Sequence, residues 1–231
     1  KAATSENLFR DIEVNMTSVE SAEENQIVKL QMGDGDSAIS QESNLDIEMI
    51  RDPAAVHRKG QQKTNMAGTK ETQEMESYQV EEDGKTVIYS GTDEAWEKNA
   101  VEEKETSSQQ TVLFDGLQNL SGAFSVSQDL ATVNKEECFE LTGTISGTQF
   151  QETFADTLKA LLGEDSSDLS GWNLQASEDE ENNEELQQKL NNVNVDCVID
   201  IYRSNILPAK ITFDLTDYLK AAGEENAQVT S

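Results

Sequence analysis

The chain has 231 residues and a formal net charge of −29, from 46 acidic and 17 basic residues. So negative a chain repels nucleic acids and anionic headgroups, and it has no basic stripe with interleaved aromatic residues, so no nucleic-acid partner is expected. Apolar residues make up 35% and aromatic residues 6%, which allows a thin core, and the length predicts a single domain over residues 1–231.

The first part of the chain alternates apolar and polar residues, the pattern of strands with one buried face. Ile12, Val14 and Met16 predict a first strand. The apolar residues of 27–32 and of 45–49 predict the next two strands, and residues 56–62 predict a weaker, more polar one. Because such alternation recurs along the chain, a fully disordered protein is excluded in spite of the charge.

Residues 78–98 predict a meander of three strands. Residues 78–80 lead into Asp83-Gly84, a dipeptide that tolerates positive φ and therefore closes tight hairpins. Residues 87–89 form the returning strand. A second turn over residues 91–93 leads to a third strand that begins at Ala95 and Trp96.

Helical spacing is confined to the second half of the chain. Residues 112–120 predict a helix that ends before Gly122. A longer helix begins at Thr148, where Thr148 and Gln151 have the spacing of a capping box, and ends at Gly163. Its apolar stripe consists of Phe150, Phe154, Leu158, Leu161 and Leu162. A short helix is expected near residues 186–190.

The remaining segments of the second half predict strands. One strand, over residues 139–145, lies between the two longer helices, and residues 193–201 and 211–215 form a strongly apolar final pair. Together with the first half, these segments predict an α+β fold, an antiparallel sheet with a few helices packed on one face.

The two cysteines, Cys138 and Cys197, both lie in predicted strands. An even number of cysteines in an exported protein favours a disulfide. Face parity argues against it, because Cys138 alternates with polar neighbours on its face and Cys197 with apolar ones, which places them on opposite faces of adjacent strands. A disulfide and two unpaired thiols both remain open.

Enzyme and metal chemistry find little support. The single histidine, His57, lies on a polar strand, and no nucleophile elbow, phosphate loop or dinucleotide fingerprint occurs. Asp34-Gly35-Asp36 begins like a calcium loop, but Leu45 stands where that loop needs a glutamate. We therefore expect no catalytic residues, no cofactor and no metal site.

The aromatic residues suggest a binding surface. If the sheet curves and the helices cover it only in part, an apolar ligand fits a groove between them. The residues expected to line this groove are Tyr78, Tyr89, Trp96, Phe139, Phe150, Phe154 and Phe213. The alternative for each of them is a plain core position.

Three stretches, in this order, resemble bacterial cell-surface lipoproteins with the LolA-like (LolA/LppX) fold, in particular small uncharacterised lipoproteins of Gram-positive bacteria. The first comprises residues 78–84, Tyr89 and residues 96–98. The second is residues 139–147 ahead of a helix. The third runs from 195 to 217 and includes residues 207–211 and 214–217.

The resemblance covers nearly the whole chain and implies a curved antiparallel half-barrel with helices across its concave face. It also implies export to the bacterial cell surface and attachment to the membrane through a lipidated cysteine upstream of the residues given. Relatives with this fold carry lipids or lipoproteins in their hollow, so the resemblance implies a lipid or another apolar molecule as the ligand.

Two functions follow as hypotheses. The first is an exported, envelope-anchored protein that binds an apolar or amphipathic ligand in a groove between sheet and helices. The alternative is a non-enzymatic surface interaction protein without a small ligand, in which the acidic exterior or the loop over residues 164–185 contacts an unknown protein partner. A filled core with an exposed patch favours this alternative.

Overall fold

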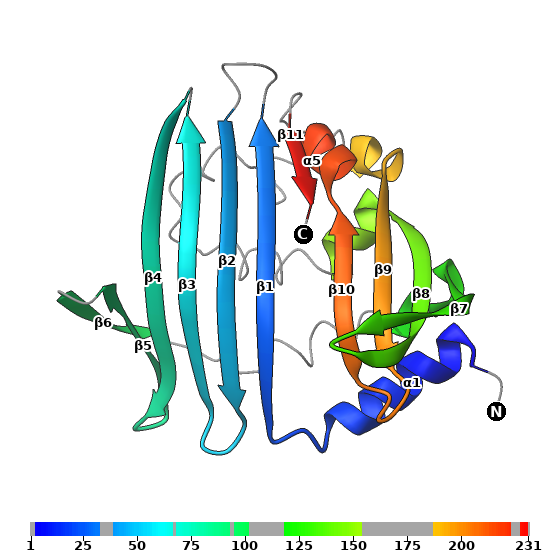
Figure 1. The fold of residues 1–231 in the computed structure, drawn as a ribbon, viewed down its shortest axis with the longest axis horizontal. Helices are drawn as coiled ribbons and strands as arrows, with labels where there is room; N and C mark the ends of the chain where they lie inside the picture. Colours follow the sequence, from blue (N-terminus) through cyan, green and yellow to red (C-terminus); the bar gives the residue numbers. More distant parts are fainter. Residues whose placement is uncertain are drawn as a thin grey trace. The chain divides into compact units, whose positions relative to one another are not determined.

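A computed structural model describes residues 3–32, 39–66, 68–92, 95–101, 118–153, 187–222 and 227–230 (Figure 1). The chain divides into two compact units. We call residues 18–108, grouped with residue 231, the meander unit, and residues 1–17 with 109–230 the terminal unit. The single domain over 1–231 stays a prediction.

The meander unit consists of six antiparallel strands that pair in sequence order. They are β1 (Ser21–Met32), β2 (Ile39–Ile50), β3 (Ala55–Met66), β4 (Thr69–Glu82), β5 (Lys85–Thr92) and β6 (Ala95–Val101). The predicted hairpin is confirmed, because Asp83 and Gly84 both have positive φ, 52° and 73°, between β4 and β5. Positive φ at both central residues matches the right-handed twist of the two strands.

The register divides the side chains of the meander sheet between two faces, because successive residues of a strand point to opposite sides. One face carries buried Val28, Leu45 and Ile47, each at most 7% exposed, together with polar residues; we call it the mixed face. The other, which we call the aromatic face, carries Tyr78 and Trp96, 40% and 45% exposed.

Gly60 marks a close approach of backbones within this sheet. A Cβ at Gly60 would collide with the carbonyl oxygen of Asn44 and would lie 2.9 Å from the Cα of Leu45, its register partner. The neighbouring strand can yield only by moving its backbone. Gly60 therefore permits the tight pairing of β2 with β3.

The terminal unit contains five strands in the order β7-β8-β9-β10-β11. They are β7 (Phe124–Val133), β8 (Glu136–Ser146), β9 (Asn194–Tyr202), β10 (Pro208–Asp214) and β11 (Ala227–Thr230), with the helices α1 (Ser5–Met16) and α5 (Thr216–Ala222) and the 3-10 turn η2 (Ser121–Ala123). Every strand pair within the two units is antiparallel. The predicted α+β class with antiparallel strands and few helices is thus confirmed.

The core of the terminal unit lies on one face of β8 and β9. Val195, Cys197, Ile199 and Ile201 alternate along β9 and are at most 1% exposed. Aromatic rings extend this core, and Phe150 packs edge-on against Phe213 and Tyr218 at centroid distances of 5.5 and 4.9 Å.

The predicted strand over Ile12, Val14 and Met16 is wrong, because these residues belong to helix α1. Leu8, Phe9, Ile12 and Met16 share one helical face and are buried, whereas Val14 is 62% exposed. The side chain of Thr4 accepts a hydrogen bond from the amide of Asn7 at 3.3 Å and caps the helix. The buried residues from Leu8 to Met16 have the spacing of one helical face. The alternation of Ile12, Val14 and Met16 covers only the last part of this segment and therefore suggested a strand.

The helix predicted from Thr148 is present and begins one residue earlier; residues 147–153 of it are described. Its capping box uses Ser146 and Gln149 in place of the predicted Thr148 and Gln151. The Gln149 amide donates to Ser146 Oγ at 3.2 Å, and the Ser146 amide donates to Gln149 Oε1 at 3.0 Å. The predicted turn at 33–36, most of the helix at 112–120 and the loop at 164–185 lie outside the described residues.

The helical assignment of residues 5–16 can be tested by truncating two side chains. Ile12→Ala removes a fully buried side chain and should lower the free energy of unfolding by about 3 kcal/mol in a urea titration. Val14→Ala should change it by less than about 0.5 kcal/mol, because Val14 faces solvent. Equal losses at the two positions would indicate the alternating strand instead.

Candidate functional site

The aromatic face of the meander unit holds a row of side chains in strict cross-strand register. Glu48, His57, Tyr78, Tyr89 and Lys98 lie opposite one another on the five strands from β2 to β6. The rings of His57 and Tyr78 stack with centroids 4.3 Å apart and an interplanar angle of 4°. The Lys98 ammonium lies 5.1 Å from the centroid of the Tyr89 ring. Such cross-strand pairs also stabilise the sheet.

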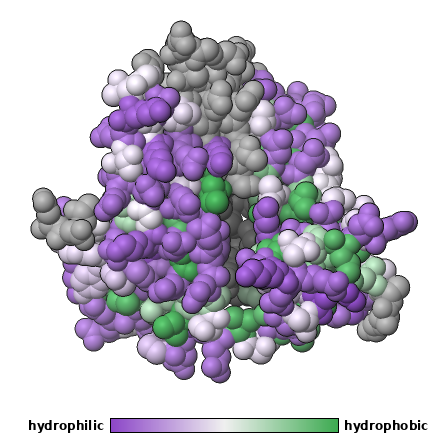
Figure 2. All heavy atoms as spheres, viewed as in Figure 1, coloured by the Kyte–Doolittle hydropathy of each residue, from purple (hydrophilic) through white to green (hydrophobic). Residues whose placement is uncertain are grey.

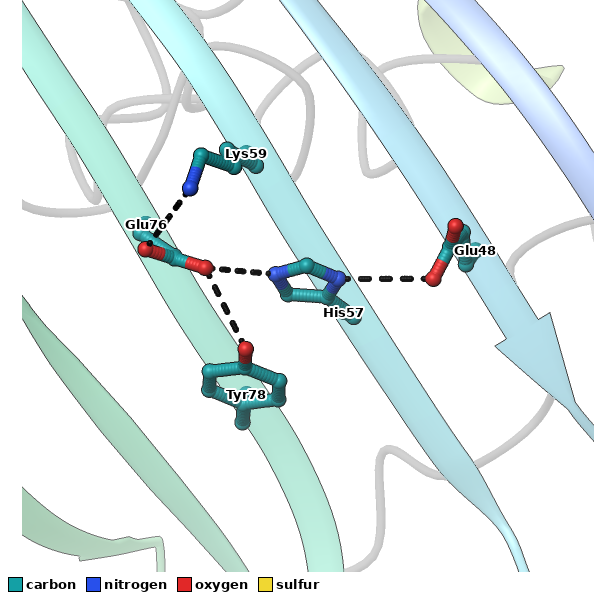
Figure 3. A network of polar contacts seen from close by, with 5 residues as sticks. All are labelled: Glu48, His57, Lys59, Glu76 and Tyr78. Atoms are coloured by element: carbon teal, nitrogen blue, oxygen red, sulfur yellow. Dashed lines mark hydrogen bonds and ion pairs between the residues drawn. The ribbon is translucent and has the colours of Figure 1, made fainter.

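A polar network holds this row in place (Figure 3). His57 contacts Glu48 Oε2 through Nδ1 at 3.4 Å and Glu76 Oε1 through Nε2 at 2.9 Å. Lys59 donates to Glu76 Oε2 at 3.4 Å, and the Tyr78 hydroxyl donates to Glu76 Oε1 at 3.2 Å. The hydrogen bond with His57, followed by those with Lys59 and Tyr78, lowers the pKa of the Glu76 carboxyl and keeps it ionised.

A second carboxylate, Glu82, anchors the edge of the same face. It accepts hydrogen bonds from the Tyr89 hydroxyl at 2.6 Å and from Lys98 Nζ at 2.7 Å. These two bonds, with Lys98 the larger influence, lower the pKa of Glu82, and the pairing raises the pKa of Lys98.

The mixed face combines apolar and charged side chains. Ile47, Arg58 and Ser77 lie in one cross-strand row, and Met49, Val56, Gln79 and Ile88 lie in the next. Exposure rises from the buried centre at Ile47 on β2 to half-buried Val56 and Ile88, so β2 to β5 present a partly open apolar strip that Gln79 interrupts between Val56 and Ile88.

Polar groups are set into this apolar strip. Arg58 Nη1 donates to Gln79 Oε1 at 3.3 Å. Desolvation lowers the pKa of Arg58 and raises that of Glu24, and the attraction between the two charges opposes both shifts. Nearby, the buried Nε2 of Gln26 has no hydrogen-bond partner among the described residues. An apolar strip with a few polar groups is the usual composition of a small-molecule site.

The aromatic residues proposed for the groove do not form one surface. Tyr78, Tyr89 and Trp96 meet on the aromatic face, so they point away from the mixed face of the same sheet. Phe150 and Phe213 belong to the core of the terminal unit. Half-buried Phe139 lies on β8, 5.5 Å from the Arg203 guanidinium, and Phe154 lies outside the described residues. Their role as groove lining stays a prediction.

Asp200 is a buried acid that sequence reasoning missed. It lies on β9 between Glu140 of β8 and Lys210 of β10, is 7% exposed, and its Oδ1 has no hydrogen-bond partner among the described residues. Burial and then Glu140 raise its pKa, whereas Lys210 lowers it. Asp200 alternates with the apolar residues of β9, so the sequence pattern predicts an exposed side chain at this position.

Within the described ranges, no group of three or more histidine, cysteine, aspartate or glutamate side chains is placed to hold a metal ion. In the same ranges, no helix has both the length and the apolar character needed to cross a membrane. The visible surface is mostly hydrophilic, with scattered apolar residues (Figure 2).

The two cysteines are unpaired, so the disulfide considered from the sequence is absent. Cys197 lies opposite Gly143, five positions along β8 from Cys138, and the two thiols therefore point to opposite faces. Burial raises the pKa of Cys197 to about 12 and also raises that of Cys138.

Both thiols should therefore be unreactive in the folded protein. We expect little colour with Ellman's reagent at about pH 8, because buried thiols stay protonated and shielded. Denaturing the unreduced protein should release two thiols per chain. A titration that finds none after denaturation would establish a disulfide and contradict the structure.

The network at Glu82 predicts a pH-dependent stability. A carboxyl whose folded pKa is depressed stabilises the protein above its unfolded pKa, and this stability is lost as the pH falls through the folded pKa. Glu82→Gln should therefore lower the urea midpoint at neutral pH, and the difference from wild type should disappear in acid, well below pH 4.5. Glu81→Gln, on the opposite face of the same strand, should behave like wild type at both pH values. A deficit of Glu82→Gln that persists in acid would contradict the role of the charge.

Comparison with known proteins identifies a family. The model of the "Family of unknown function (DUF6612)" matches residues 4–225, so the chain belongs to this family. The crystal structure of LprF from Mycobacterium bovis is similar to 98% of this chain and 89% of that chain, with a TM-score of 0.45 and 11% sequence identity. No curated protein matches the sequence.

Proposed function

We propose that this DUF6612 protein is an exported, envelope-anchored binding protein without enzymatic activity, which holds an apolar or amphipathic ligand such as a lipid on the mixed face of the meander unit. The observation that carries the proposal is the half-open apolar strip of β2 to β5 with the Arg58 guanidinium set into it. Export and the lipid anchor rest on the resemblance of the sequence motifs to LolA-like lipoproteins.

The chemistry of the strip suits a molecule with an apolar chain and a polar head. Met49 and Val56 are register partners with half-buried apolar surface, and Ile88 lies beyond Gln79 in the same row. Each methylene of a ligand chain laid on such apolar surface contributes about 0.8 kcal/mol. Arg58 and the amide of Gln26 are hydrogen-bond donors one row and two rows away from that surface. A carboxylate or phosphate head would accept from a guanidinium that its surroundings have partly desolvated.

The ligand can be sought directly. Protein purified gently from its host should show, in native mass spectrometry, a reproducible extra mass that organic solvent extracts as a lipid. A clean mass together with no uptake of a dansyl-labelled fatty acid would overturn the carrier function. It would leave the alternative, a surface interaction protein with a protein partner.

The site on the mixed face is tested by adding one carboxylate to either side of β3. Val56→Glu should weaken binding of the dansyl-labelled fatty acid by about tenfold or more, because it places a charge on the apolar strip. Gln61→Glu adds the same charge to the aromatic face and should leave the affinity unchanged. Circular dichroism checks that both variants fold, and equal affinities would place the ligand elsewhere.

A further inference from the structure

We infer that the aromatic face of the meander unit is a second binding site, for a neutral saccharide chain. Its centre is the pair Tyr78 and Trp96, whose ring centroids lie 5.6 Å apart with an interplanar angle of 41°. Both residues keep 40% or more of their surface in solvent. The site is independent of the ligand proposed for the mixed face, because the two lie on opposite sides of one sheet.

The absence of a side chain at Gly91 allows the indole of Trp96 to lie close to the backbone of β5. Gly91 is the register partner of Trp96, and a Cβ there would lie 2.9 Å from Trp96 Cα, 3.0 Å from indole Cδ2 and closer still to the Ala95 carbonyl oxygen. Without that Cβ the indole packs down onto the backbone of β5. The rest of its surface stays exposed beside Tyr78, so the two rings form an open corner on a rigid support.

Such a corner matches the faces of a pyranose ring. The C–H groups on a sugar face carry partial positive charge, and the face of an aromatic ring carries partial negative charge. Two rings inclined to each other contact successive faces of a sugar chain. An aliphatic ligand would gain nothing from the carboxylates that border the rings, whereas the hydroxyls on a sugar rim need such partners.

Those partners are already fixed in position. Glu76 receives hydrogen bonds from His57, Lys59 and Tyr78, which hold its carboxylate without any ligand. A carboxylate has about four acceptor sites, so it can still accept from a sugar hydroxyl. Glu48, held by His57 at the other side of the row, offers a second acceptor (Figure 3). Binding then costs little ordering of side chains.

Local charge selects a neutral partner. The chain carries −29 overall, which repels an anionic polymer. On this face Lys59 pairs with Glu76, and Lys98 with Glu82 and the Tyr89 ring, so cations of the chain itself occupy the positions that a cationic partner would seek. A neutral polyhydroxyl chain matches this balance of donors and acceptors.

The test is calorimetric titration of the full chain with two neutral tetrasaccharides, cellotetraose and chitotetraose. At least one should bind saturably with a Kd below about 1 mM, and added sodium chloride should change the affinity little. Trp96→Ala should weaken binding by about tenfold or more. Leu130→Ala removes an equally exposed apolar residue (44%) from the terminal unit and should bind like wild type.

A second variant keeps the test decisive if Trp96→Ala does not fold. Tyr78→Ala removes the other ring of the corner and should weaken binding by about tenfold relative to wild type, and an unchanged affinity in this variant also overturns the site. Failure of both sugars to bind wild type, or an unchanged affinity in Trp96→Ala, overturns the site. Fatty-acid uptake by Trp96→Ala separates this result from the function proposed for the mixed face.

Discussion

The strict alternation of side chains along the paired strands of the meander unit is the constraint on which both proposed sites depend. Each strand pairs with its neighbour without a register shift, so every residue is assigned to one of two faces. A slip of one residue would exchange the faces entirely. Close pairing at Gly60 and the hairpin at Asp83-Gly84 both oppose such a slip.

In strand β3 the alternation places neighbouring residues on the two different faces of the sheet. Val56 and Arg58 point to the mixed face, whereas His57 and Lys59 point to the aromatic face. Four consecutive residues therefore contribute to two surfaces of different chemistry, one apolar with a partly desolvated guanidinium and the other aromatic with carboxylates held by His57 and Lys59. The low apolar content of the chain is consistent with a sheet that places polar side chains on both of its faces.

The terminal unit follows a different rule. Its apolar residues are concentrated on one face of β8 and β9, where Leu141, Ile145 and Ile199 are at most 1% exposed, and helices carry the complementary rings. Asp200, in the opposite phase of β9, is nevertheless buried, with an acidic neighbour opposite it. A buried carboxyl with an oxygen that has no partner among the described residues carries a desolvation cost, and burial accordingly raises the pKa of Asp200.

The sequence by itself indicated β1 to β6, β8, the final pair β9 and β10, and the turn at Asp83-Gly84, because alternation and turn chemistry are local properties of the chain. It gave no prediction for β7 or β11. It also determined that the two cysteines have opposite parity. Only the tertiary structure decided that residues 5–16 are helical, since Ile12 and Met16 fit either period and their burial chooses between them. Only the structure could separate Tyr78 and Trp96 from Phe150 and Phe213, because the partners of an aromatic side chain depend on strand register and packing between segments far apart in the chain.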